Sequence, residues 1–141
     1  MNSEELQEAY APDPLTSPEA PFEQVKQFHV AFGLPVKDRA SWPSDERLEL
    51  RLELLEEELE EVVQAVHNRD LVNLAKELAD LEYVVNGFAI EAGIDLPAVT
   101  TVVHESNMSK LGADGKPMYR EDGKVLKGPN YMEAQLDDVL F

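Results

Sequence analysis

The chain has 141 residues, enough for one domain with a single hydrophobic core and too few for two. Its 29 acidic residues against 12 basic ones give a formal net charge of −17, which disfavours nucleic acid and anionic membranes as partners of the chain as a whole. No cysteine occurs, which excludes disulfides, thiolate catalysis and cysteine-ligated metal sites. Because the N-terminus also lacks the basic start and apolar run of a secretory signal, we expect a cytoplasmic protein.

The first part of the chain is expected to be an arm. Residues 1–21 contain four of the nine prolines and show no hydrophobic periodicity. The apolar spacing over residues 22–32 then predicts a short helix that Gly33 ends. We therefore expect an N-terminal arm over 1–21 and a single domain over 22–141.

Three longer helices are expected in the middle of the chain. Ser44, Asp70 and Asp95 are residue types that cap helix N-termini, and Gly93 is typical of a helix end. These signals predict helices over residues 45–67, 71–91 and 96–110. The fold class is therefore all-α, an antiparallel helical bundle with a long pair at its centre and a third helix beside it.

The C-terminal part of the chain changes character. It is rich in glycine, and the sequence Glu121-Asp122-Gly123-Lys124 predicts a tight turn between two short strands. We expect a small C-terminal hairpin or loop that lies over the functional site.

A helical wheel divides the acids of residues 45–67 into two groups. The expected core stripe consists of Leu48, Leu52, Leu55, Leu59, Val62 and Val66. A solvated acidic face lies away from it and comprises Glu46, Glu49, Glu53, Glu56 and Glu60. Glu58 and Glu61 instead fall within an apolar flank, and Glu57 lies on the border.

The next helix repeats this anomaly. It is apolar almost all round, yet Glu77 and Asp80 lie along its apolar edge. The pairs Glu58/Glu61 and Glu77/Asp80 share a three-residue spacing that points both side chains the same way. If the two helices are antiparallel neighbours, four to five carboxylates converge and repel one another unless a cation is bound. All-oxygen ligation favours Mg²⁺ first and Mn²⁺ next, and argues against zinc.

These residues resemble a known family. Glu57-Glu58-Leu59-Glu60-Glu61, followed by Glu77-Leu78-Ala79-Asp80, resembles the EExxE…ExxD signature of the MazG-like, all-α nucleoside triphosphate pyrophosphohydrolases. That family is related to all-α dUTPases, dCTP pyrophosphatases and phosphoribosyl-ATP pyrophosphohydrolase. Residues 102–110 and 122–128 are similar to the Asn–Lys helix end and the DGK-x-x-K tail of one MazG-like subgroup.

The resemblance implies a magnesium site made of Glu57, Glu58, Glu61, Glu77 and Asp80. The shifted frame Glu56-Glu57-Glu58-Leu59-Glu60 fits the same motif, but it would use two acids of the solvated face. Family members cleave between the α and β phosphates to give a nucleoside monophosphate and pyrophosphate. Either Glu57 or Glu58 is the candidate catalytic base that orients or deprotonates the attacking water.

The resemblance also implies that Asn107, Lys110, Lys124 and Lys127 bind substrate. Charge supports an anionic ligand independently, because residues 110–127 contain five basic and three acidic residues and carry a net charge of +2 in a chain of −17. The alternatives are an ordinary solvated hairpin for the tail and polar helix-end roles for Asn107 and Lys110.

The function expected from these features is Mg²⁺-dependent hydrolysis of a (deoxy)nucleoside triphosphate, with dUTP or another noncanonical nucleotide as substrate in nucleotide-pool cleansing. A homodimer or a dimer of dimers is expected. The helix over residues 71–91 is apolar almost all round, and a single chain has few other helices to enclose it. Two alternatives remain open: a phosphoribosyl-ATP pyrophosphohydrolase-like enzyme and a non-catalytic, acidic helical adaptor.

Overall fold

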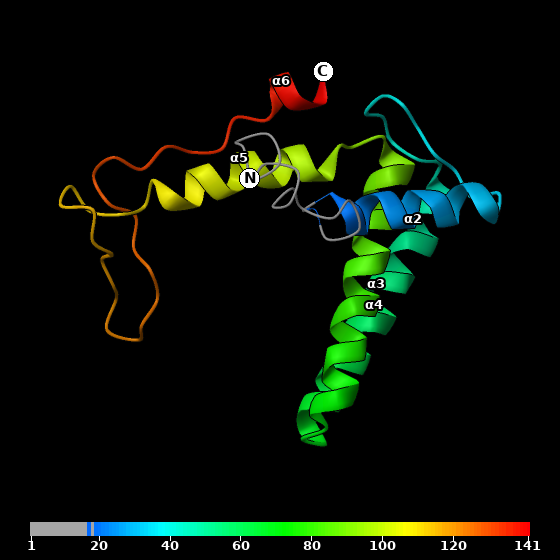
Figure 1. Cartoon of the computed structure of the whole chain (residues 1–141), viewed down its shortest axis with the longest axis horizontal. Coiled ribbons are helices and arrows are strands. Elements are labelled where there is room, and N and C mark those ends of the chain that lie inside the picture. The colour runs from blue at the N-terminus through cyan, green and yellow to red at the C-terminus, as the bar shows by residue number, and fades with distance from the viewer. Residues whose placement is uncertain (1–16, 18) are drawn as a thin grey trace, which may run out of the picture.

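The computed structural model describes residues 17 and 19–141 and shows an all-α fold (Figure 1). Its helices are α2 (Ala20–Ala31), α3 (Asp45–His67), α4 (Leu71–Ala92), α5 (Leu96–Met108) and the short α6 (Asp137–Leu140). The expected arm over residues 1–21 lies largely outside the described residues. The first described helix begins at Ala20, two residues earlier than expected, with a proline in its first turn.

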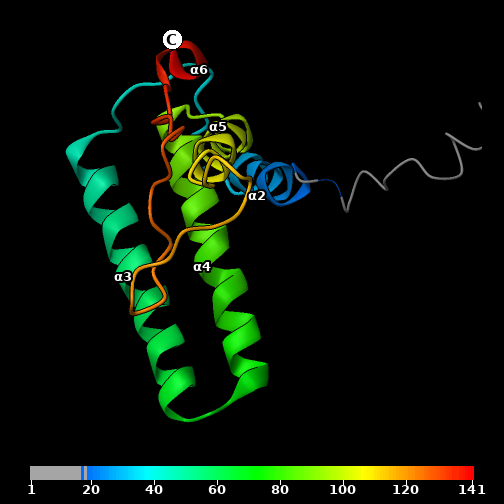
Figure 2. The same cartoon turned by 90° about the vertical axis from the view of Figure 1, so that its left-hand side faces the viewer.

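Helices α3 and α4 form a long antiparallel pair, seen side by side in Figure 2. The Ser44 hydroxyl accepts a hydrogen bond from the Arg47 N–H, and the Asp70 carboxylate accepts one from the Asn73 N–H. Gly93 ends α4 in the left-handed conformation, at φ 69°. The expected caps of both helices are therefore confirmed, and they fix where the central pair begins and ends.

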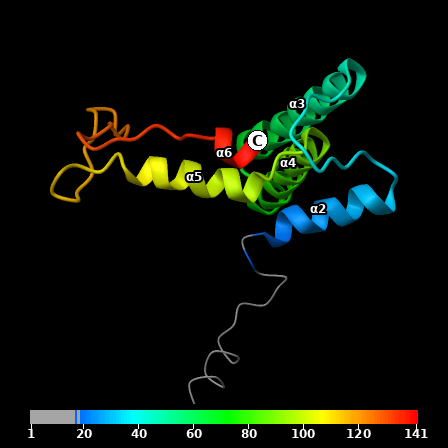
Figure 3. The same cartoon turned by 90° about the horizontal axis from the view of Figure 1, so that it is seen from above.

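The other helices gather at one end of this pair. Helix α2 packs against α4, whereas α5 leaves the end of α4 and extends away from the pair (Figure 3). Helix α5 is capped by Asp95 as expected, but it contains no buried residue. The expectation of a third helix packed beside the pair is thus wrong for a single chain, because Gly93 turns the chain sideways and α5 then meets no long partner.

The expected C-terminal hairpin is not confirmed. Within the described residues it is reduced to one isolated antiparallel bridge between Tyr119 and Val125. The tight turn itself is present, with Gly123 at φ 87° and its N–H donating to the Arg120 carbonyl. The adjoining residues are exposed, so no buried face holds two strands in register.

The core lies where α2, α3 and α4 meet, and the expected stripe on α3 is only partly in it. Leu52 and Leu59 are 53% and 55% exposed. The seam between α3 and α4 instead contains residues one position earlier, Arg51, Glu58 and Ala65. The expected stripe is rotated away from the partner helix, which leaves an apolar surface uncovered in the single chain.

Candidate metal centre

Four carboxylates meet between the central helices. Oxygen atoms of Glu58 and Glu61 on α3 and of Glu77 and Asp80 on α4 all lie within 4.8 Å of one another. In each pair the three-residue spacing brings both side chains to the same edge of the helix. The structure therefore brings together four of the five residues that the sequence nominated as metal ligands.

This acidic cluster contains buried oxygens that lack donors. Glu77 is 5% exposed, and Glu58 is half-buried. Glu58 Oε2 and Glu77 Oε2 are buried without a hydrogen-bond partner. Because burying an unpaired carboxylate oxygen is costly, these are two atoms whose charge a bound cation could neutralise.

The crowding of negative charge raises carboxyl pKa values here. Burial raises the pKa of Glu58, and the charges of Asp80 and Glu77 raise it further. A hydrogen bond shared with Glu77, followed by the charge of Glu77, raises the pKa of Glu61 to about 7. The metal-free cluster therefore tends to retain a proton near neutral pH.

One lysine already contacts the cluster. Lys76 Nζ donates to Asp80 Oδ2 at 2.7 Å and to Glu77 Oε1 at 3.3 Å. The hydrogen bond with Asp80 is the main cause that raises the pKa of Lys76, so its ammonium group stays charged. Sequence reasoning missed this contact, although the i,i+4 spacing of Lys76 and Asp80 is a recognised signal for an ion pair.

The fifth nominated ligand, Glu57, is not part of this group. It is exposed on α3, next to Glu58 in the chain but about 100° around the helix from it. The helical wheel predicts Glu57 at the border of the apolar flank, and in the structure its side chain is exposed to solvent beside the acidic cluster. Its side chain is a candidate for a contact with water or substrate beside the cluster rather than for membership of it.

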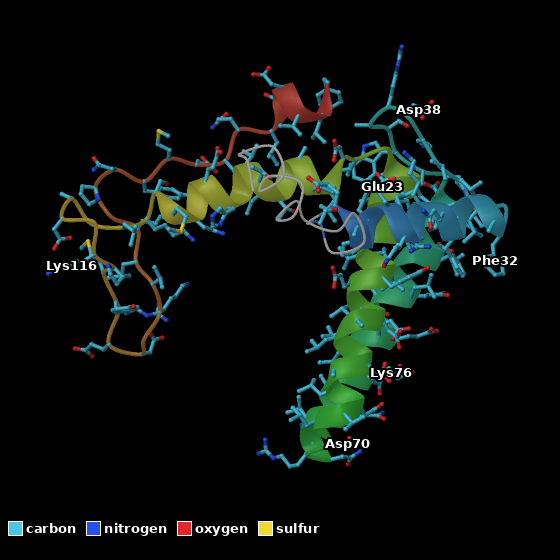
Figure 4. All side chains as sticks on the ribbon, viewed as in Figure 1. Glu23, Phe32, Asp38, Asp70, Lys76 and Lys116 are labelled. Atoms are coloured by element: carbon cyan, nitrogen blue, oxygen red, sulfur yellow. The ribbon has the colours of Figure 1, made fainter. Side chains whose placement is uncertain are left out.

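The nominated substrate residues lie elsewhere in the single chain. Asn107 is exposed at the end of α5, and Lys110 follows it. Lys124 and Lys127 belong to the basic tail, residues 110–127, which lies beyond the far end of α5 from the α3/α4 pair (Figures 1 and 4). In Figure 4, Lys116 of this tail and Lys76 of α4 are on opposite sides of the molecule. The expectation that the tail covers the site is wrong within one chain, because α5 carries the tail outward.

A second polar group shares the seam between α3 and α4. Arg47 Nε donates to Glu91 Oε1 at 2.7 Å, and Arg51 Nε lies 3.1 Å from Glu91 Oε2. Glu91 is fully buried and Arg51 is 5% exposed, and burial lowers the pKa of Arg51. Sequence reasoning missed this ion-pair cluster. One signal was available: Arg51 lies seven residues before Glu58, a spacing that keeps both side chains on the same face of α3.

The donor set fits a hard divalent cation. The cluster offers carboxylate oxygens alone, with no histidine or cysteine, and such ligands suit Mg²⁺ or Mn²⁺. Its unpaired buried oxygens supply the negative charge that such an ion would neutralise. The acidic cluster can thus hold a metal and, through it, attract a polyphosphate.

Comparison with known proteins identifies the family. The profile named phosphoribosyl-ATP pyrophosphohydrolase matches residues 25–107, which contain all four clustered carboxylates. The chain belongs to this family. Phosphoribosyl-ATP pyrophosphohydrolases are MazG-like, all-α enzymes, so the chain is a pyrophosphohydrolase that acts on a nucleotide, and the adaptor alternative is set aside.

Two further comparisons were made, one with solved structures and one with curated proteins. A solved structure of a proposed NTP pyrophosphohydrolase from Exiguobacterium sp. 255-15 is 26% identical, with a TM-score of 0.44, and the match covers 81% of this chain and 88% of that one. No curated protein matches the chain significantly.

Within the described residues, no helix has the length and apolarity needed to cross a membrane.

Proposed function

We propose that this pyrophosphohydrolase cleaves a (deoxy)nucleoside triphosphate between the α and β phosphates and releases the monophosphate and pyrophosphate. The proposed substrate is dUTP or another noncanonical deoxynucleotide, and the proposed role is nucleotide-pool cleansing. The observation that carries the proposal is the convergence of four carboxylates within 4.8 Å, two of them with buried, unpaired oxygens. This arrangement is suited to a divalent metal that receives a polyphosphate.

In the proposed reaction, four carboxylates bind the metal and one carboxylate acts on the attacking water. Glu58, Glu61, Glu77 and Asp80 would hold Mg²⁺, with Mn²⁺ as a substitute, and the bound metal would neutralise phosphate charge and activate water. Glu57 or Glu58 would orient or deprotonate the water that attacks phosphorus. Glu57 is exposed at the rim of the cluster, which leaves its carboxylate free to act as this base.

The proposed substrate contacts require a second copy of the chain. Asn107, Lys110, Lys124 and Lys127 are the proposed phosphate and nucleoside ligands, yet they belong to the end of α5 and the basic tail, which extend away from the α3/α4 pair of their own chain (Figure 1). Exposed leucines on both central helices offer a surface for the second copy: Leu52 and Leu59 on α3, and Leu71 and Leu78 on α4. In the proposed homodimer, or dimer of dimers, the basic tail of one subunit completes the site of the other.

Subunit mixing tests this composite site. Neither E77Q nor the double variant K124A/K127A should be active alone, because one lacks a metal ligand and the other lacks basic tail residues. If the tail acts across subunits, a one-to-one mixture should recover about a quarter of the wild-type activity, since half of the dimers then contain one intact site of two. A mixture that stays inactive while hybrid dimers form would show that each chain uses its own tail.

A second candidate substrate is phosphoribosyl-ATP. The observation that favours it is the family match itself, which carries that enzyme's name and spans most of α2 to α5. The base and sugar pocket decides between the two substrates, whereas the acidic cluster is compatible with both.

A substrate panel tests the proposed function. The protein should be incubated with Mg²⁺ and each of the deoxynucleoside triphosphates, dUTP included, and with phosphoribosyl-ATP. The proposal expects kcat/KM to be highest for dUTP or another noncanonical deoxynucleotide. Turnover of phosphoribosyl-ATP with failure on every deoxynucleotide would replace it by the second candidate.

A further inference from the structure

Lys76 occupies the acidic cluster in a way that the reaction does not require. It immediately precedes Glu77, and its ammonium group lies 2.7 Å from Asp80 Oδ2 and 3.3 Å from Glu77 Oε1. Its own side chain is 65% exposed, whereas that of Glu77 is 6% exposed. The lysine thus reaches from the solvent edge of α4 over two of the four candidate ligands; Figure 4 labels it part-way along the pair.

We propose that Lys76 is a resident cation of the metal centre, which partly neutralises the metal-free cluster and is displaced when a divalent ion binds. This inference rests on the proposed metal-dependent function and adds to it a residue that sets metal affinity. In this proposal Lys76 does not bind the metal itself, and it changes metal affinity through its contacts with Glu77 and Asp80.

Geometry makes the two cations exclude each other. Mg²⁺ binds oxygen at about 2.0 to 2.1 Å, and Lys76 Nζ lies 2.7 Å from Asp80 Oδ2, so an ion bound to this oxygen would lie within about 5 Å of the ammonium nitrogen. Two positive charges at that distance repel strongly, and both compete for the same lone pairs. This repulsion favours withdrawal of the ammonium when the ion binds, and the flexible four-carbon stem of a largely exposed lysine allows it to move.

The lysine does not neutralise the whole acidic cluster. Lys76 contacts one oxygen each of Glu77 and Asp80, while Glu77 Oε2 and Glu58 Oε2 remain buried without a donor. Lys76 therefore stabilises the metal-free protein only in part. A divalent ion, which carries twice the charge and contacts several oxygens at once, would satisfy the atoms that the lysine does not reach.

Metal binding to substituted proteins tests the proposal without recourse to activity. Mn²⁺ binding, followed by the electron paramagnetic resonance signal of the free ion, should be measured for wild type, K76M, K76R and E77Q. Removing the competing charge in K76M should tighten Mn²⁺ binding about three- to tenfold, which is the size expected from losing two exposed ion pairs. K76R keeps the charge and should remain close to wild type.

The matched control is K26M, which removes the same charge from α2, where the described residues show Lys26 in no ion pair. It should leave Mn²⁺ affinity unchanged within about twofold. In EDTA, K76M should also melt at a lower temperature than wild type, and saturating Mg²⁺ should raise its melting temperature by more than it raises that of wild type.

The outcomes separate the inference from the proposed function. If wild type binds Mn²⁺, E77Q does not, and K76M binds no more tightly than wild type, Lys76 is not a competing cation and the inference is overturned. If wild type itself binds no Mn²⁺, the metal centre is absent, and the proposed function fails together with the inference.

Discussion

At the scale of single residues, Glu61 is one of the carboxyls through which the metal-free cluster responds to pH. Its pKa is raised to about 7, first by the hydrogen bond shared with Glu77 and then by the charge of Glu77. The folded protein therefore keeps a proton that the unfolded chain releases near pH 4.5. It follows that the metal-free fold is favoured at low pH and loses this contribution as the pH rises through about 7.

We predict that E61Q removes much of this pH dependence. In EDTA, the free energy of unfolding of wild type should fall between pH 5 and pH 8, and the fall should be smaller in E61Q because glutamine carries no titrating proton. Urea unfolding at the two pH values measures the difference. E60Q, which changes an exposed acid on the same helix, should retain the wild-type slope, and an equal slope in E61Q would contradict the assignment.

The sequence predicted these acids from their position on the helix wheel. Glu58, Glu61, Glu77 and Asp80 lie in apolar sectors where an unpaired carboxylate is costly, and this cost marks a site. Glu57 could not be placed by the same argument, because a border position is compatible with either exposure or burial. Whether these four residues bind metal remains a prediction.

At the scale of the helices, a polar seam fixes how α3 packs on α4. The Arg51 guanidinium is held by Glu91 and donates to the Val84 carbonyl at 3.0 Å. It passes directly over Gly87, where an added Cβ would collide with Arg51 Nη2 and lie 3.0 Å from His29 Nε2. Glycine at position 87, in the C-terminal part of α4, avoids this collision despite its low helix propensity.

We predict that G87A lowers the free energy of unfolding by about 2 to 4 kcal/mol, because the methyl group must push a buried, paired guanidinium aside. Chemical denaturation measures the loss. In the R51A background the same substitution should cost less, and this coupling distinguishes the steric cause from a general helix effect. Additive losses in the two backgrounds would show that Arg51 is not the obstacle.

The helices themselves were predictable from local chemistry, whereas their packing was not. Ser44, Asp70, Asp95 and Gly93 mark helix ends through hydrogen bonds and a backbone conformation that involve only near neighbours. The face of α3 that meets α4 depends on the partner helix. Apolar periodicity selected the leucine stripe, but the seam contains Arg51, Glu58 and Ala65. A buried arginine is favourable there only because Glu91 on α4 pairs with it, and the sequence of α3 alone does not show that partner.

At the scale of the whole molecule, the single chain leaves a large apolar stripe uncovered. Leu52 and Leu59 on α3, together with Leu71 and Leu78 on α4, are each at least half exposed. Their seven-residue spacing keeps each pair on one face of its helix. Large exposed leucines that recur on one face of each helix favour a surface that another protein covers, and we expect a second copy of the chain.

We predict that L59E converts the proposed oligomer to a smaller species, because a carboxylate at the centre of the stripe would be desolvated on association. Light scattering coupled to size-exclusion chromatography measures the molar mass. Q64E adds the same charge on the solvated face of α3 and should leave the mass unchanged. Wild type and L59E of equal mass would indicate that the stripe is not the interface.

The identity of the cleaved bond tests the central claim most directly. With saturating Mg²⁺ and dUTP, wild type and E60Q should produce dUMP and pyrophosphate in equal amounts, without orthophosphate, and E77Q should produce neither. Chromatography of the nucleotides and direct quantification of pyrophosphate and orthophosphate give the answer. Formation of dUDP with orthophosphate, or full activity in E77Q, would contradict a pyrophosphohydrolase built on the acidic cluster of α3 and α4.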